Sequence, residues 1–441
     1  MENYNQFQVL VPENFYTDEI RMLFLTNLND KKLLMAELSI NARSRVYSID
    51  TLRGLVMVIM ALDHVRDFFF RAAVTAGGAS VATNPTNMAT TTPALFFTRW
   101  ITHFCAPLFV FLAGTSVFLM TQKKSKNEIS LFLIKRGFWL VIVELVIVSF
   151  SWSFNPLYNL FFLQVIWAIG ISMILLGLLI RLPFWLILFL GIIIVFGHNL
   201  LDYPVINKNL KGGLLADLIY FTNFSVYNID KSHSAIIVYA FLPWTGLMLS
   251  GYCFGKLYRK TVDPLWRRKI LLMMGASLIL LFIVLRFING YGDPVHWSHQ
   301  ERGEVFTFLS FLNVNKYPPS LDFLCMTIGG GMIVLSLLEN VQNRLTRFFQ
   351  VYGRVPMFYY ILHLYLIHLI VIIVFFLQGF STSEIVTPQD PFFFKPPGFG
   401  FGLLGVYAVW VFVVLVLYPL CKNYDRYKTA HAKEKWWLSY L

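Results

Sequence analysis

The chain has 441 residues, of which 57% are hydrophobic and only 14% are charged, whereas soluble globular domains are about 25% charged. Together with a mean hydropathy of +0.62, this composition excludes an ordinary soluble protein and predicts a chain that crosses a membrane several times. The formal net charge of +12 would suit a nucleic-acid partner. The basic residues, however, lie in short segments between apolar runs, which argues against nucleic-acid binding.

Apolar runs follow one another along most of the sequence. They lie near residues 50–70, 94–121, 131–152, 159–180, 183–200, 234–256, 269–288, 318–338, 355–378 and 402–420. Each run is close to the roughly 20 residues that a helix needs to cross a bilayer. The fold class predicted is therefore an all-α, polytopic integral membrane protein with about ten transmembrane helices.

Basic residues gather in alternate connections between these runs. The connections concerned are 123–136, 256–269, 344–354 and 422–435. Because cytoplasmic loops carry an excess of Lys and Arg, this distribution places both termini in the cytoplasm. We therefore divide the chain into a cytoplasmic N-terminal tail (1–46), a transmembrane domain (47–421) and a basic cytoplasmic C-terminal tail (422–441).

The first apolar run, SIDTLRGLVMVIMALDHVRDFFF, contains Arg53 and His64, eleven positions apart. At 100° per residue, eleven steps return to nearly the same helix face, about 16 Å further along the axis. Ionisable groups at such depth are costly, so the pair is a candidate functional site. Asp63 points about 100° away from His64 and is a poor direct partner. A carboxylate or hydroxyl from another span would serve His64 better. The alternative is a histidine that only satisfies a helix contact.

The second and third runs carry further ionisable residues. Arg99 and His103 lie four residues apart on one face, at the depth expected for His64. They either share a site with it, or Arg99 anchors at the interface while His103 bonds a backbone carbonyl. The third run begins with Lys135-Arg136 and carries Glu144 near its middle. A buried carboxylate needs a partner or is protonated, so we expect Glu144 to pair with a histidine or an arginine or to be protonated, and take it as a secondary site candidate.

The ninth run is preceded by Arg354 and contains His363 and His368. Five residues apart on a helix, the two histidines face about 140° from each other, so they do not both line one narrow site. We take the deeper His363 as the site candidate. The four cysteines have no paired spacing, and no cluster has the spacing of metal ligands, so no metal is predicted.

Five segments of the sequence resemble a known family. They are SIDTLRGLVMVIMALDHVRDFFF, TTTPALFFTRWITHFCAPLFVFLAGTSVFL, KRGFWLVIVELVIVSFSW, FLNVNKYPPSLDFL and GRVPMFYYILHLYLIH, from about residue 46 to about residue 370. They resemble the DUF1624 membrane proteins of bacteria, which are grouped with the catalytic domain of heparan-alpha-glucosaminide N-acetyltransferase. The Arg53-x10-His64 spacing is also similar to that of the wider transmembrane acyltransferase superfamily, which includes acyltransferase-3 proteins.

The resemblance implies a multi-pass acyltransferase of a bacterial cytoplasmic membrane. It would move an acetyl group from cytoplasmic acetyl-CoA to a hydroxyl or amine of a glycan outside, with Arg53 serving acyl-CoA and His64 catalysis. We expect Lys135 and Arg136 to help bind the CoA phosphates. His64 would act as general base, with His103 or Asp63 orienting it or shuttling its proton. Direct transfer and an acyl-histidine intermediate both fit this sequence. Homo-oligomer formation is left open.

One departure and one rival function accompany this interpretation. In the heparan enzyme, the catalytic histidine belongs to the loop before the second span, and the corresponding position here, near Thr92-Pro93, has no histidine. Either His64 carries that role here, or the bacterial members do different chemistry. The rival is a proton-coupled transporter in which His64, His103 and Glu144 form a relay. A tunnel that links Arg53 to His64 would favour the enzyme, whereas alternating vestibules around a midplane site would favour the transporter.

Overall fold

The computed structural model describes residues 46–71, 84–386, 392–432 and 434–440. The chain divides into two units, 1–47 and 48–441, and the description below concerns the second. The expected N-terminal tail, 1–46, lies almost entirely outside the described residues.

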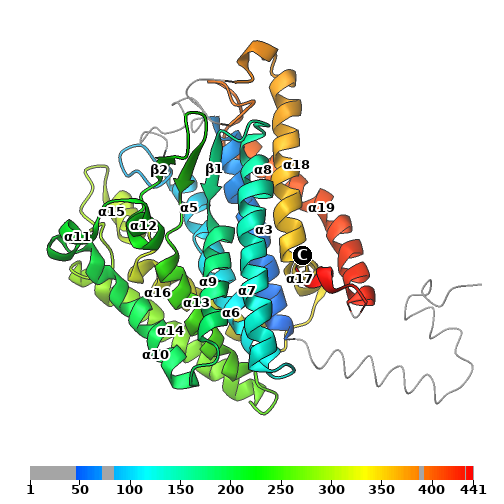
Figure 1. The fold of residues 1–441 in the computed structure, drawn as a ribbon. Coiled ribbons are helices and arrows are strands. Elements are labelled where there is room, and N and C mark those ends of the chain that lie inside the picture. The colour runs from blue at the N-terminus through cyan, green and yellow to red at the C-terminus, as the bar shows by residue number, and fades with distance from the viewer. Residues whose placement is uncertain (1–45, 72–83, 387–391, 433, 441) are drawn as a thin grey trace, which may run out of the picture. The chain divides into compact units, whose positions relative to one another are not determined.

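Helices dominate the described part of the chain (Figure 1). The long ones are α3 (Tyr47–Phe69), α5 (Pro93–Thr102), α6 (Cys105–Thr121), α7 (Lys126–Val143), α9 (Val165–Leu179), α10 (Phe184–Gly197), α13 (Phe241–Phe254), α14 (Pro264–Ile288), α15 (Glu304–Leu312), α16 (Leu321–Leu338), α17 (Arg344–Arg354), α18 (Pro356–Leu377) and α19 (Leu403–His431). The short ones are α8 (Ser149–Ser153), α11 (Pro204–Leu210) and α12 (Leu214–Ala216). Each of the ten predicted apolar runs therefore contains at least one helix.

Six helical segments of the described chain are long and apolar enough to cross a membrane. They are Pro93–Thr121, Phe184–Asp202, Pro264–Ile288, Leu321–Leu338, Pro356–Leu377 and Leu403–His431. The chain is thus a multi-pass membrane protein, but ten spans are not confirmed. Helix α9 is apolar but short, and α13 has only 14 residues. Helix α3 carries Asp50, Arg53, Asp63, Arg66 and Asp67 within its length.

A small three-stranded sheet lies where α8 ends and α9 begins (Figure 1). Its strands are β1 (Leu160–Leu163), β2 (Ser225–Asn228) and β3 (Ser234–Ile237), in the order β1-β3-β2. Strand β1 pairs in parallel with β3, and β2 pairs antiparallel with β3. The segment between α14 and α16 is held by Arg286, whose guanidinium donates to the carbonyl oxygens of Val295, Ser310, Phe311 and Asn313. This anchoring fixes the loop that follows α15.

Helix α3 packs closely against α17 through two glycines. A Cβ atom on Gly54 would lie 1.7 Å from the carbonyl oxygen of Phe349, and one on Gly353 would lie 1.9 Å from that of Asp50. Only glycine permits this approach, which also brings the Gly353 carbonyl within 3.2 Å of the Arg53 guanidinium. The Gly54–Gly353 contact therefore positions Arg53 as well as the two helices.

We expect Gly54→Ala to destabilise the protein, because the added methyl group must displace backbone rather than a flexible side chain. Overpacking of this kind costs about 1–3 kcal/mol, occasionally more. Gly197→Ala is the matched control, since no atom lies within 4 Å of the position of its Cβ. Thermal unfolding of both purified variants in detergent checks this. Equal melting temperatures would show that the close approach of α3 and α17 is not required.

Candidate active site

A cavity of about 1610 Å³ lies within the unit and is lined by residues of α3, α5, α6, α7, α9 and α18, the sheet and the loop after α15. Both Arg53 and His64 line it. The two residues lie on one face of α3, about 16 Å apart along its axis. The cavity that they line therefore extends along α3 from Arg53 to the imidazole of His64. Arg136, Arg354 and Lys428 also line it.

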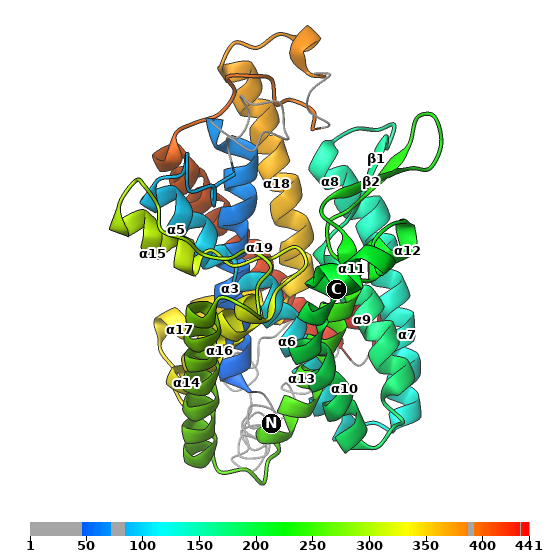
Figure 2. The same ribbon diagram turned by 90° about the vertical axis from the view of Figure 1, so that its left-hand side faces the viewer.

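Helix α18 runs alongside α3 (Figures 1 and 2), and His64 contacts it through His363. Its Nδ1 lies 2.7 Å from Nε2 of His363, and the two rings stack with centroids 5.0 Å apart. The indole of Trp152 meets the His64 ring edge-on at 5.1 Å. His363 is fully buried, with its Nδ1 3.0 Å from the carbonyl oxygen of Tyr359. The expectation of a carboxylate or hydroxyl partner for His64 is therefore wrong, because the partner is a second histidine.

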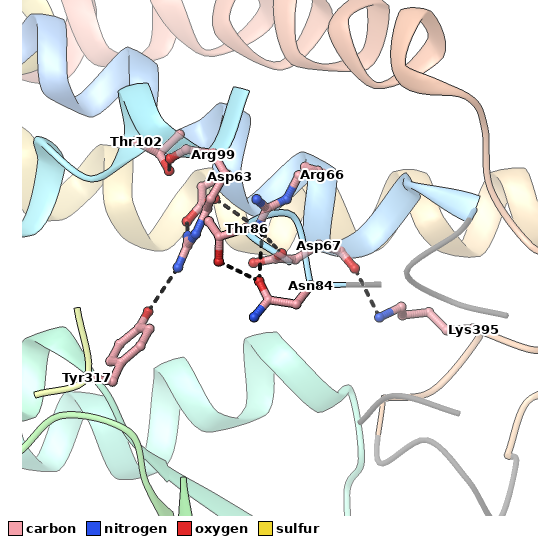
Figure 3. A network of polar contacts seen from close by, with 9 residues as sticks. All are labelled: Asp63, Arg66, Asp67, Asn84, Thr86, Arg99, Thr102, Tyr317 and Lys395. Carbon is pink, nitrogen blue, oxygen red and sulfur yellow. Dashed lines mark hydrogen bonds and ion pairs between the residues drawn. The ribbon is translucent and has the colours of Figure 1, made fainter. Parts of the chain in front are cut away.

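Asp63 forms the centre of a buried ion-pair network on the α3 side of the cavity (Figure 3). Its Oδ1 lies 2.9 Å from the Arg66 guanidinium, and its Oδ2 accepts a hydrogen bond from Arg99. Arg66 also pairs with Asp67, at 2.5 Å. Arg99 reaches the hydroxyl of Tyr317 at 3.4 Å. Asp63 thus holds two arginines and does not orient His64, as its angular position on the helix predicts. The interpretation of Arg99 as a simple interface anchor is wrong.

The loop after α15 brings a further cation to the cavity. The ammonium of Lys316 lies over the rings of Tyr317 and Tyr239, at 5.1 Å and 5.9 Å from their centroids. All three residues line the cavity, together with Arg99. Sequence reasoning did not select Lys316 or Tyr317 as site residues. Their adjacency within the quoted segment FLNVNKYPPSLDFL was the available signal.

His103 lines the cavity but is not bonded to His64 or Asp63. It is 3% exposed, its ring lies 5.4 Å from that of Phe323, and its Nδ1 has no hydrogen-bond partner. The expected bond from His103 to a backbone carbonyl is not observed among the described residues. His103 therefore shares the cavity of His64 without being its hydrogen-bond partner.

Glu144 serves the fold at a different place. It begins a π-helical turn, Glu144–Val148, between α7 and α8. Its carboxylate accepts hydrogen bonds from the backbone N–H groups of Gln164, at 3.3 Å, and Trp167, at 3.0 Å. The expected pairing with a histidine or arginine is wrong, because the free N–H groups at the start of α9 satisfy the carboxylate instead.

Arg53 is held in place by three neighbours at the other end of the cavity. Its guanidinium donates to Ser116 Oγ at 2.8 Å, to the Gly353 carbonyl oxygen at 3.2 Å and to Asp50 Oδ1 at 3.4 Å. This geometry aims a fixed cation along α3 and leaves part of its side chain, 17%, exposed.

The other inner-face candidates differ in where they point. Arg136 lines the cavity and donates to the backbone carbonyl oxygen of Ser439. Arg354 also lines it and pairs with Asp425 at 3.2 Å. Lys135 is exposed and is not part of the lining, because adjacent helical residues point about 100° apart. We therefore remove Lys135 from the candidate site. No group of three or more described His, Cys, Asp or Glu residues is arranged to hold a metal ion.

The chain is a helical, multi-pass membrane protein with a long cavity lined by cationic residues and by two histidines. Comparison with protein families gives the assignment. Residues 45–286 match the family described as heparan-alpha-glucosaminide N-acetyltransferase, catalytic, so the chain belongs to that family and is a membrane transferase. No curated protein matches the chain. The matched range includes Arg53, His64 and Arg99, but ends before α18 and His363.

Proposed function

We propose that this protein transfers the acetyl group of cytoplasmic acetyl-CoA to a hydroxyl or amine of a sugar or glycan on the outer side of the membrane. The observation that supports this most is the single cavity that contains both Arg53 and His64. A cavity of this kind lets a long, charged donor enter at one membrane face while its reactive end meets an acceptor from the other. The family match adds that transfer to glycans is within the chemistry of relatives.

The proposal includes a topology. Helices α3, α7 with α8, α9 and α13 would join the six apolar segments to make ten spans, with both termini in the cytoplasm. Charges within α3 are compatible with a span because they face the cavity or each other, rather than lipid. We place the protein in the DUF1624 group and in a bacterial cytoplasmic membrane.

Donor binding would rely on the arginines near the inner end. Arg53, Arg136 and Arg354 line the cavity, and guanidinium binds phosphate through paired, charge-assisted hydrogen bonds. With the phosphates there, the pantetheine arm would follow α3 for the roughly 16 Å to His64. The thioester carbonyl would then lie beside the imidazole.

At His64, the acceptor hydroxyl or amine gives its proton to the imidazole while its oxygen or nitrogen attacks the thioester carbonyl carbon. The tetrahedral intermediate collapses as the carbon–sulfur bond breaks, and the CoA thiolate takes up the proton from His64. Arg99 and Lys316 place positive charge in the same cavity, where the intermediate carries negative charge. Asp63 would act through Arg99, by fixing its position.

The transporter interpretation receives no support from the side-chain geometry. It requires His64, His103 and Glu144 to form a relay, but the Glu144 carboxylate is bonded to the backbone of α9 and is not part of the cavity lining. His64 and His103 line one continuous cavity instead of separate vestibules.

Arg53→Ala is expected to weaken acetyl-CoA binding about tenfold or more while the protein stays folded, because a charge-assisted hydrogen bond contributes roughly 1.5–3 kcal/mol. Lys135→Ala is the matched control: it removes a cation from the same membrane face, but one that is exposed and outside the cavity. Titration calorimetry in detergent measures both. Unchanged affinity in Arg53→Ala, or equal loss in the two variants, would remove Arg53 from the donor site.

The function itself is tested by incubating the purified protein with radiolabelled acetyl-CoA and a panel of amino sugars and neutral sugars. Time-dependent appearance of label in a sugar supports the proposal. If the protein binds acetyl-CoA but transfers label to none of the sugars, the result would contradict transfer to glycans.

A further inference from the structure

The hydrogen bonds around His363 determine which of its nitrogens carries a proton. Its Nδ1 lies 3.0 Å from the carbonyl oxygen of Tyr359. A carbonyl oxygen only accepts, so Nδ1 of His363 must be the N–H. In a neutral imidazole the other nitrogen, Nε2, is then an acceptor. The fully buried position of His363 disfavours the doubly protonated, charged ring.

The tautomer of His363 determines that of His64, because Nδ1 of His64 lies 2.7 Å from Nε2 of His363. Because Nε2 of His363 accepts, Nδ1 of His64 must donate. His64 is therefore protonated on Nδ1, and its Nε2 carries the free lone pair. No described residue bonds that Nε2, and His64 lines the cavity while His363 does not. The unprotonated nitrogen is the one left to face a substrate.

We infer that His363 is a positioning residue that holds His64 as its Nδ1–H tautomer, so that Nε2 is the atom that takes the acceptor's proton. The proton transfer to Nε2 rests on the proposed function, whereas the tautomer of His64 follows from the hydrogen bonds alone. Hydrogen bonds link the Tyr359 carbonyl oxygen to His363 and His363 to His64. They fix the direction of the His64 ring and keep its reactive nitrogen unprotonated, as an orienting group does in other acid–base sites.

The neighbouring rings restrict the dyad further. Tyr359 stacks on His363 with the ring planes 5° apart, and Trp152 contacts the edge of His64 from α8. His64 is consequently fixed by α18 on one side and α8 on another. The positioning residue lies outside the segment that matches the family, 45–286. The base and the group that orients it thus come from regions 299 residues apart.

The test begins with solid-state nitrogen-15 NMR of the protein in lipid, labelled only at its nine histidines. The His64 signals are identified by their loss in His64→Gln. We expect Nδ1 of His64 to be protonated and Nε2 unprotonated at neutral pH. A protonated Nε2 would overturn the inference, whether in the opposite tautomer or in the charged ring.

Variants at position 363 supply the second readout. His363→Phe keeps a ring but removes the acceptor, so the Nε2–H tautomer of His64 becomes populated and kcat should fall at least about tenfold, with KM for acetyl-CoA unchanged. His363→Gln restores an acceptor and should recover part of kcat and the Nδ1–H signal. An unchanged His64 tautomer in His363→Phe would contradict the inference. If the dyad is observed but His64→Gln keeps full transferase activity, the proposed role of His64 as general base fails and the inferred tautomer stands; absence of transferase activity in the wild-type protein would instead remove the proposed function.

Discussion

Replacing His64 with alanine is expected to lower the rate of acetyl transfer by about 10²–10⁴, the usual effect of losing a general base. Acetyl-CoA binding should stay unchanged, because Arg53, the residue proposed to hold the phosphates, lines the cavity about 16 Å away along α3. The variant should also stay folded, since His64 is partly exposed to the cavity. Initial rates with labelled acetyl-CoA, together with calorimetry for the donor, measure both effects.

Two other histidines make this experiment specific. His299→Ala alters an exposed histidine between α14 and α15 that does not line the cavity and should leave the rate unchanged. His103→Ala should lower the rate less than His64→Ala, because His103 lines the cavity but does not bond the base. An active His64→Ala protein with an inactive His103→Ala protein would move the catalytic centre to His103.

Asp63→Ala should have the largest effect on stability. Removing this carboxylate leaves the guanidinium groups of Arg66 and Arg99 without their shared, buried partner. Breaking one side of a buried ion pair typically costs about 3–5 kcal/mol. Thermal unfolding in detergent should show a strongly lowered melting temperature, and reduced expression is expected with it.

Asp67→Ala is the matched control for Asp63→Ala. Asp67 also pairs with Arg66, but its side chain is 40% exposed, and exposed pairs contribute about 0–1 kcal/mol. The Asp67 variant should therefore melt close to the wild type. If both variants melt alike, the network around Asp63 does not stabilise the folded protein.

The sequence predicted those features that depend on one helix alone. Helical periodicity placed Arg53 and His64 on the same face of the first run, and both line one cavity. The same angular argument predicted that Asp63 would not bond His64, and its carboxylate points to Arg66 and Arg99. These relations follow from 100° per residue and need no knowledge of how helices are arranged.

Contacts between distant segments were beyond that reasoning. His363 was selected as a site residue from its depth, but nothing in a single sequence shows that α18 lies against α3 at His64. The wrong expectation for Glu144 has a similar cause. A buried carboxylate is satisfied equally by a cation or by the N–H groups of a helix start, and only the packing of α7 against α9 decides between them.

The number of spans illustrates a different difficulty. Hydropathy identified ten runs, and helices form in all of them. Only six segments of the described chain, however, are both long enough and apolar enough to cross a membrane. The first run fails on apolarity because of its charged residues: Asp63 and Asp67 both pair with Arg66 near the C-terminal end of α3.

The most direct test of the proposed function is transfer across a sealed membrane. Purified protein is reconstituted into liposomes with labelled acetyl-CoA trapped inside, and a membrane-impermeant sugar that was acetylated in detergent is added outside. The account predicts labelled acetyl-sugar in the outer solution, produced at a rate that falls by about 10²–10⁴ with His64→Ala. Product that forms only when donor and acceptor share one compartment would contradict a cavity that joins the two faces of the membrane.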